Sequence, residues 1–166
     1  MTHPCACGGV ALKLADESET LELGKKIAPI LHPGLSVFLR GDLGAGKTTF
    51  ARGVLRGMGY PEKVKSPTYN LIEVYKISKL YLYHFDFYRF NHPSEWEEAG
   101  FREYFNAESI CLVEWPERVG ELLPVADLTL VFRISGAQRV VEIRPGTEAG
   151  RLCMEKLKLS SDSSGS

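Results

Sequence analysis

A segment that could hold phosphate occupies residues 39–50, which read LRGDLGAGKTTF. It fits the pattern G-x-x-x-x-G-K-[ST], in which a backbone loop surrounds the phosphates of a nucleotide. The fixed positions are Gly41, Gly46, Lys47 and Thr48. A backbone can turn several N–H groups toward one anion only where side chains are absent, which explains the additional glycine at Gly44. The segment therefore predicts binding of a nucleoside triphosphate.

The residues after this loop predict how the triphosphate is held. A helix beginning near Lys47 directs its free N–H groups and the positive end of its dipole toward the anion. The Lys47 ammonium would reach the β- and γ-phosphates, and the Thr48 hydroxyl would bind Mg²⁺. A glycine-rich turn without a ligand is the alternative. The complete pattern and its flanks, an apolar strand-like run and then a helical run, disfavour it.

Two carboxylates follow apolar runs at positions where strands are expected to end. Asp86 closes LYLYHFD and Glu114 closes ICLVE. Mg²⁺ prefers hard oxygen ligands, and a water molecule must be oriented for attack on the γ-phosphate. In open α/β sheets such groups lie at the carboxyl ends of the strands. Either residue alone could be an ordinary acid at a strand end, but the pair beside a phosphate loop favours a metal–nucleotide site.

Three further positions are open to two interpretations. Ser66-Pro67-Thr68 could order around a γ-phosphate like a switch segment, although composition alone favours a plain Ser-Pro turn. Trp115 could form a wall of the site or be a half-buried aromatic residue. His84 has no partner histidine nearby in sequence, so a core or second-shell position is favoured over direct metal binding.

Length and composition indicate one soluble globular domain. The chain has 166 residues, of which 44% are hydrophobic and 25% charged, and its net charge is −1. No run approaches the ~18 apolar residues of a membrane span, and no signal-peptide pattern opens the chain, so we expect a cytoplasmic protein. The near-neutral charge argues against a large basic surface for nucleic acid. The four cysteines, Cys5, Cys7, Cys111 and Cys153, complete no zinc set and are expected to be free thiols.

The pattern of apolar residues predicts an α/β fold with a mainly parallel central sheet, antiparallel hairpin additions and flanking helices. Expected helices begin after Asp16, after Lys47, at Pro93 and at Thr147. Expected strands are residues 35–39, two hairpins at 71–87 and 128–145, and residues 109–115. We expect a flexible extension at residues 1–11, one domain at 12–159 and a disordered serine-rich tail at 160–166.

Five segments together resemble the TsaE family of bacterial ATPases, which serve in the synthesis of threonylcarbamoyladenosine at position 37 of tRNA. They are GDLGAGKTTFARG, VKSPTYNLIEVY, YHFDFYRF, EEAGFREYF and ICLVEWPER. The order of S-P-T-Y, H-F-D-x-Y-R and L-V-E-W is much more specific than the phosphate loop alone. The resemblance runs from about Leu14 to Leu159 and implies a P-loop NTPase domain that uses ATP and Mg²⁺.

The resemblance also implies roles for individual residues. Gly44, Ala45, Gly46, Lys47, Thr48 and Thr49 would surround the phosphates, with Thr48 on Mg²⁺. Glu114 matches a metal-linked glutamate, and Asp86 an aspartate near the γ-phosphate or its attacking water. Thr68 belongs to the switch-like segment. Glu17 and Arg139 match positions near the nucleotide.

The resemblance further implies two partner proteins, TsaD and TsaB, and ATP hydrolysis that resets that pair between turnovers. Contact with tRNA would then be indirect, which agrees with the net charge. Two alternatives remain open from the sequence: a small-molecule kinase on the same loop, and a nucleotide-gated binding module with negligible turnover. The guanine-reading N-K-x-D pattern does not follow the loop, so a GTPase is disfavoured.

Overall fold

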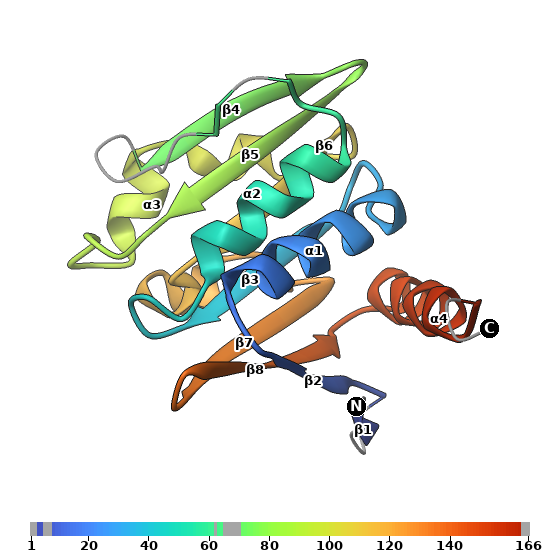
Figure 1. Ribbon diagram of the computed structural model, residues 1–166. Coiled ribbons are helices and arrows are strands. Elements are labelled where there is room, and N and C mark those ends of the chain that lie inside the picture. The colour runs from blue at the N-terminus through green and yellow to red at the C-terminus, as the bar shows by residue number, and fades with distance from the viewer. Residues whose placement is uncertain (1–2, 5–7, 62, 65–70, 164–166) are drawn as a thin grey trace.

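A mixed β-sheet with helices on both faces organises the chain (Figure 1). The computed structural model describes residues 3–4, 8–61, 63–64 and 71–163. The strands lie in the order β1-β2-β8-β7-β3-β6-β5-β4. Their bounds are β1 His3–Pro4, β2 Val10–Leu14, β3 Ser36–Gly41, β4 Ile72–Ile77, β5 Leu80–Asp86, β6 Ser109–Glu114, β7 Leu128–Ser135 and β8 Gln138–Pro145. The helices are α1 Glu17–Ile27, α2 Lys47–Gly57, α3 Ser94–Glu98 and α4 Glu148–Ser163, with short 3₁₀ turns at Ala28–Ile30, Phe101–Tyr104, Pro116–Arg118 and Gly120–Leu122.

Four neighbouring strands at the centre of the sheet, β7, β3, β6 and β5, run parallel. The hairpins β4–β5 and β7–β8 and the pairs β2–β8 and β1–β2 are antiparallel. The predicted fold class, a mainly parallel central sheet with antiparallel additions and flanking helices, is confirmed. Because parallel strands place their carboxyl ends at one edge, the residues that follow β3, β5 and β6 meet there.

The helix α1 begins after Asp16, as the sequence predicts. The Asp16 side chain accepts a hydrogen bond from the Glu19 N–H at 3.0 Å, which satisfies one of the free donors of the first turn. The Glu19 carboxylate reaches back to the Ala15 N–H. The α-helix ends at Ile27, and a 3₁₀ turn containing Pro29 follows, because proline cannot continue the hydrogen-bond ladder.

The helices α1 and α2 pack side by side over one face of the sheet, as Figure 1 shows. Two glycines permit this close approach. A Cβ at Gly24 would lie 2.4 Å from the Phe50 carbonyl oxygen, and one at Gly53 would lie 2.2 Å from the Leu21 carbonyl oxygen. The contact positions the N-terminus of α2, and with it the phosphate loop, against the start of α1.

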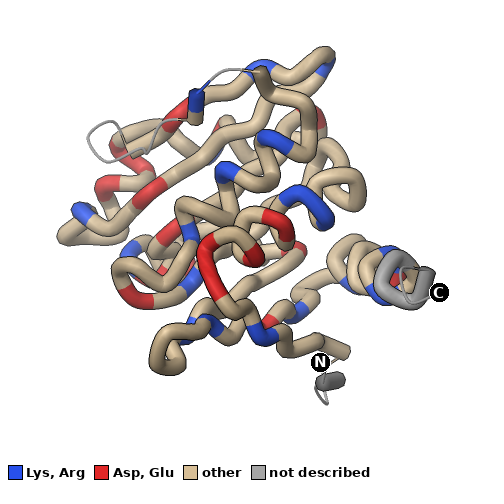
Figure 2. Tube along the Cα trace, in the orientation of Figure 1, with Lys and Arg blue, Asp and Glu red and all other residues tan. Residues whose placement is uncertain are grey.

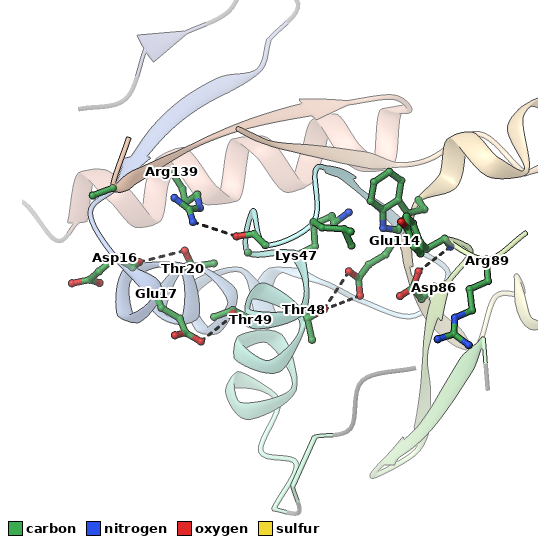
Figure 3. A pocket seen from close by; sticks show the side chains of 16 residues that line it. Asp16, Glu17, Thr20, Lys47, Thr48, Thr49, Asp86, Arg89, Glu114 and Arg139 are labelled. Carbon is green, nitrogen blue, oxygen red and sulfur yellow. Dashed lines mark hydrogen bonds between the residues drawn. The ribbon is translucent and has the colours of Figure 1, made fainter. Parts of the chain in front are cut away.

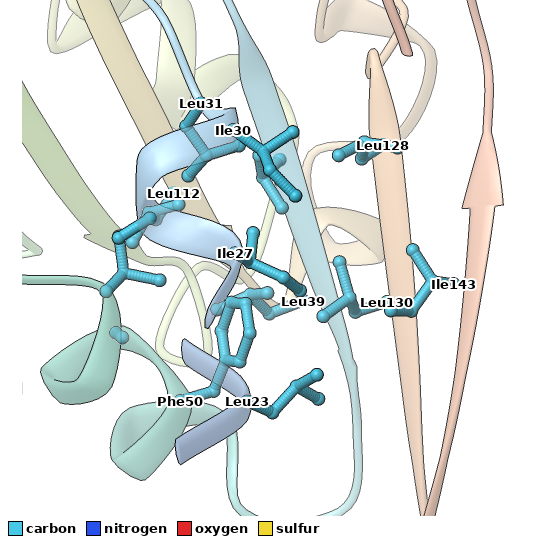
Figure 4. Packing of buried hydrophobic residues seen from close by; sticks show 14 of the residues in the cluster. Leu23, Ile27, Ile30, Leu31, Leu39, Phe50, Leu112, Leu128, Leu130 and Ile143 are labelled. Atoms are coloured by element: carbon cyan, nitrogen blue, oxygen red, sulfur yellow. The ribbon is translucent and has the colours of Figure 1, made fainter. Parts of the chain in front are cut away.

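Alternating side chains divide the core between the two faces of the sheet. One cluster joins α1 and α2 to the sheet through residues such as Leu23, Ile27, Phe50 and Leu112 (Figure 4). The second cluster, on the opposite face, is mainly aromatic. It contains Phe85, Phe87, Phe90, Trp96, Phe101, Cys111, Val113, Val119 and Leu123.

The structure corrects three predictions. Val10 and Ala11 belong to β2, which pairs with β8, so the extension predicted for residues 1–11 is wrong where it meets the sheet. The sequence PSEWEEAGFREYF, from Pro93 to Phe105, predicts one helix, but the structure has α3 followed by a 3₁₀ turn, because Gly100 lies between them at φ 73°. The helix α4 continues to Ser163, so the tail predicted at 160–166 is wrong for its first four residues. Among the described helices, none is long and apolar enough to cross a membrane.

Candidate nucleotide-binding site

A cavity of about 590 Å³ lies at the carboxyl edge of the parallel strands, beside the start of α2 (Figure 3). Ten of the residues singled out from the sequence line it. They are Glu17, Gly44, Gly46, Lys47, Thr48, Thr49, Asp86, Glu114, Trp115 and Arg139. The volume falls in the range of about 300–1,000 Å³ typical of small-molecule and cofactor sites.

The phosphate loop depends on backbone conformations that favour glycine. Gly44 and Gly46 have φ angles of 78° and 112°, in the region that side chains rarely adopt. Gly41 has φ 144°, and a Cβ there would lie 2.5 Å from the carbonyl oxygen of Phe132 on β7. Gly41 and Ala45 belong to the loop but do not line the cavity, and Ala45 is fully buried.

Lys47 is buried between the loop and Trp115. Only 4% of the residue is exposed, its ammonium donates a hydrogen bond to the Gly41 carbonyl, and Nζ lies 3.7 Å from the centre of the Trp115 ring. Burial lowers the pKa of the ammonium, and the negative charge of Glu114 partly opposes this shift. A cation on an aromatic face is stabilised by the ring's quadrupole. The loop therefore holds its lysine in place before any anion is bound.

The Thr48 hydroxyl and the Glu114 carboxylate face each other across the floor of the cavity. The Thr48 Oγ1 lies 3.3 Å from both carboxylate oxygens. Glu114 is 3% exposed, and its Oε2 lies 2.6 Å from Nε2 of His84, which is fully buried. The predicted core position of His84 is thus confirmed, and its contact with Glu114 joins it to the cavity.

Asp86 lies next to Glu114, because the two residues are register partners at the ends of β5 and β6. Its carboxylate accepts a hydrogen bond from the Tyr88 N–H at 3.0 Å. Burial raises the pKa of Asp86, and the neighbouring charge of Glu114 adds to the shift. Trp115 directly follows Glu114 and has a left-handed backbone conformation, with φ 57°. The centre of its ring lies 5.0 Å from the centre of the Tyr88 ring. The two carboxylates and the tryptophan therefore lie together at one end of the cavity.

The opposite end of the cavity is built by α1 and the β7–β8 hairpin. The Thr49 hydroxyl donates to the Glu17 carboxylate at 3.3 Å, and the Arg139 guanidinium donates to the Gly44 carbonyl at 3.3 Å. Arg52 lies 3.9 Å from the same carboxylate of Glu17. Residues more than a hundred positions apart in the sequence thus meet at the phosphate loop.

Thr68 and the rest of the S-P-T segment lie outside the described residues, so their predicted role stays a prediction. The cavity also includes lining residues that the sequence interpretation did not assign to it: Asp16, Thr20, Leu43, Tyr88, Arg89 and Ala137. Tyr88 and Arg89 belong to the YHFDFYRF segment, so their place in that segment could have indicated that they line the cavity. Thr20 and Ala137 enter through the packing of α1 and the β7–β8 turn, which no local pattern indicates.

The donors in this cavity fit a magnesium–nucleotide complex. The Thr48 hydroxyl and the Glu114 carboxylate are hard oxygen ligands, and they face each other beside the phosphate loop. In the described part of the chain, no three or more His, Cys, Asp and Glu residues are grouped so that they could hold a metal alone.

Comparisons with known proteins identify the family. Residues 14–141 match the family model "Threonylcarbamoyl adenosine biosynthesis protein TsaE". The tRNA threonylcarbamoyladenosine biosynthesis protein TsaE of Haemophilus influenzae is 45% identical over 83% of this chain and 90% of its own. The protein of the same name from Bacillus subtilis is 40% identical over 75% and 77%. The crystal structure of Bacillus subtilis YdiB superposes with a TM-score of 0.79 at 30% identity, covering 97% of this chain and 98% of that one. The chain belongs to the TsaE family of threonylcarbamoyladenosine biosynthesis proteins and has its P-loop NTPase fold.

Proposed function

We propose that this protein is a Mg²⁺-dependent ATPase that assists a TsaD–TsaB pair in the threonylcarbamoylation of adenosine 37 of tRNA, resetting the pair between turnovers. Family membership supports the pathway. The residues of the cavity support the hydrolytic chemistry, and the family resemblance supports the named partners. The activity would take place in the cytoplasm, together with the tRNA that the partners modify.

One observation carries the chemical part of the proposal. The Thr48 hydroxyl lies 3.3 Å from the Glu114 carboxylate, and Asp86 is the register neighbour of Glu114. A hydroxyl and two carboxylates therefore converge where the γ-phosphate of a nucleotide on the loop would lie. Binding alone requires only the loop, whereas hydrolysis also requires groups that hold the metal and orient water.

Each residue has a distinct task in this mechanism. The loop amides and the start of α2 bind the phosphates, and Lys47 supplies a positive charge at the β- and γ-phosphates. Thr48 and Glu114 would hold Mg²⁺, which neutralises charge on the phosphate oxygens. Asp86 would orient the attacking water. Because burial raises the pKa of Asp86, this carboxylate accepts a proton more readily than an exposed aspartate does.

Partner proteins would complete the site. Leu43 and Tyr88 line the cavity and are 63% and 40% exposed, so one side of the cavity is open to solvent in the single chain. Water exclusion and correct placement of the attacking water speed phosphoryl transfer. We therefore expect slow hydrolysis by the protein alone and faster hydrolysis when TsaD and TsaB cover this side.

Contact with tRNA would be made by the partners. Figure 2 shows Lys and Arg dispersed over several elements of the described chain, with acidic residues close to the start of α1. Binding to a nucleic acid backbone needs clustered positive charge. The dispersed pattern and the net charge of −1 support an indirect role.

Steady-state phosphate release, measured alone and with both partners, tests the proposal. We expect a low rate alone and a higher rate with TsaD and TsaB, and we expect Thr68→Ala to lose most of the stimulation while keeping nucleotide affinity. Transfer of the phosphoryl group to a small molecule, instead of phosphate release, would favour a kinase. Tight nucleotide binding without turnover in any mixture would favour a nucleotide-gated binding module.

A further inference from the structure

His84 is a fully buried histidine with a single hydrogen bond to the candidate metal site. It lies on β5 two residues before Asp86, on the same face of the sheet, and its side chain has no solvent exposure. Nε2 lies 2.6 Å from Oε2 of Glu114. Nδ1 is buried and has no hydrogen-bond partner among the described residues. The imidazole therefore uses one ring nitrogen and leaves the other unsatisfied.

Core packing alone does not account for an imidazole at this position. Two of its neighbours on the same face of the sheet are apolar: Leu82 precedes His84 on β5, and Leu112 is its register partner on β6. Its register partner on β4 is Glu73, for which no hydrogen bond to His84 is found. A leucine or methionine would fill such a place without burying a polar atom that lacks a partner, which is costly. The hydrogen bond from Nε2 to Glu114 is the interaction that an apolar residue could not make.

That hydrogen bond restricts the carboxylate of Glu114. The terminal torsion of a glutamate is broad and rotates easily unless its oxygens are held. On the cavity side, both oxygens lie 3.3 Å from Thr48 Oγ1, so Thr48 does not select between them. His84 contacts Oε2 alone. A carboxylate that binds a metal can only accept hydrogen bonds, so with a metal bound Nε2 would be the donor of this bond.

We propose that His84 is a positioning residue for divalent-cation binding: it fixes the carboxylate of Glu114 in the orientation that presents Oε1 to a metal beside Thr48. This inference rests on the proposed function, because it assigns Glu114 to the metal. Residues that orient a metal ligand usually change metal affinity by about 10- to 100-fold when they are replaced.

Two near-isosteric variants separate this role from packing. In His84→Gln, the amide nitrogen is three bonds from Cβ, as Nε2 is in histidine, and it can still donate to Glu114. In His84→Asn, the amide ends two bonds from Cβ and cannot reach. Leu82→Val is the control, since it loosens the same face of β5 without altering a polar contact.

The measurement is a Mg²⁺ titration of the binding of a fluorescent ADP analogue, repeated for ATP hydrolysis by the protein with both partners. His84→Asn should need about 10- to 100-fold more Mg²⁺ for half-maximal effect and regain most of its kcat at saturating Mg²⁺. His84→Gln and Leu82→Val should respond close to wild type. In a Glu114→Gln background, His84→Asn should add no further shift.

The outcomes distinguish this inference from the proposed function. If wild type shows Mg²⁺-dependent binding and His84→Asn needs no more Mg²⁺ than wild type, the positioning role is wrong and the proposed function stands. An equal shift in Leu82→Val would also overturn the positioning role, because loosened packing would explain both. If wild type itself shows no Mg²⁺ dependence in binding or hydrolysis, the proposed function fails and this inference fails with it.

Discussion

Replacing Lys47 by methionine should separate nucleotide binding from folding. Methionine is unbranched and similar in length, so it can fill the space between the loop and Trp115 while removing the charge. Only 4% of Lys47 is exposed, and burial lowers the pKa of its ammonium, which indicates that burial makes a charge at this position unfavourable. We therefore expect Lys47→Met to fold and to unfold in urea at least as late as wild type.

The loss of nucleotide affinity can be estimated from the contacts of the ammonium. A hydrogen bond from a charged group is worth about 1.5–3 kcal/mol. At about 1.4 kcal/mol per factor of ten, losing one such bond to phosphate weakens binding roughly 10- to 150-fold. The ammonium would exchange its contact with the Gly41 carbonyl for phosphate oxygens, so the lower half of this range is the closer expectation.

Competition between ATP and a fluorescent ADP analogue measures this effect, and phosphate release should fall to background in the same variant. Lys25→Met is the matched control. Lys25 is an exposed lysine on α1 that pairs with Glu22 at 3.1 Å and does not line the cavity. A folded Lys47→Met protein that binds and hydrolyses ATP as wild type does would refute the assignment of the phosphate loop.

Three further predictions concern the site and the core. Glu114→Gln should raise the Mg²⁺ concentration required for nucleotide binding and hydrolysis, because an amide oxygen is a poorer ligand than a carboxylate. Asp86→Asn should reduce hydrolysis more than nucleotide binding. A shifted Mg²⁺ requirement in Asp86→Asn alone would exchange these roles. ATP should displace a fluorescent ADP analogue far better than GTP, and equal displacement would remove the base preference. Burial raises the pKa of Cys111 to about 12, so its thiol should react slowly with a thiol reagent at pH 8. In a Cys5→Ser, Cys7→Ser variant, the reaction of Cys111 should become faster only as the pH approaches about 12, and it should be rapid in urea.

Features encoded by neighbouring residues could be predicted from the sequence. The phosphate loop is one continuous segment, and its glycines, lysine and threonine have the conformations and places that the pattern requires. The strand-end carboxylates were also predictable, because an apolar run that stops at an acid indicates where a buried strand reaches the edge of a sheet. Their mutual proximity followed from the parallel arrangement, which the register of Asp86 with Glu114 confirms.

Features that depend on tertiary pairing could not be predicted in the same way. The sequence VALKL of β2 lacks strict alternation, and it is a strand because β8 supplies hydrogen-bond partners. The helical pattern from Pro93 to Phe105 contains no proline beyond its start, but Gly100 takes a left-handed conformation and divides it. The contact between His84 and Glu114 joins residues 30 positions apart, and no spacing rule indicates it.

The segment HFDFY shows how one strand serves both the core and the site. Because side chains alternate across a sheet, His84 and Asp86 point to the face that carries α2 and the cavity. Phe85 and the following Phe87 belong to the aromatic cluster on the opposite face, and Phe85 stacks on Phe105 at 5.5 Å. The burial of the aromatic neighbours therefore holds Asp86 at the cavity and His84 behind it, against Glu114. A rigid sheet positions functional groups more precisely than a loop does, which is what a carboxylate pair on adjacent strand ends requires.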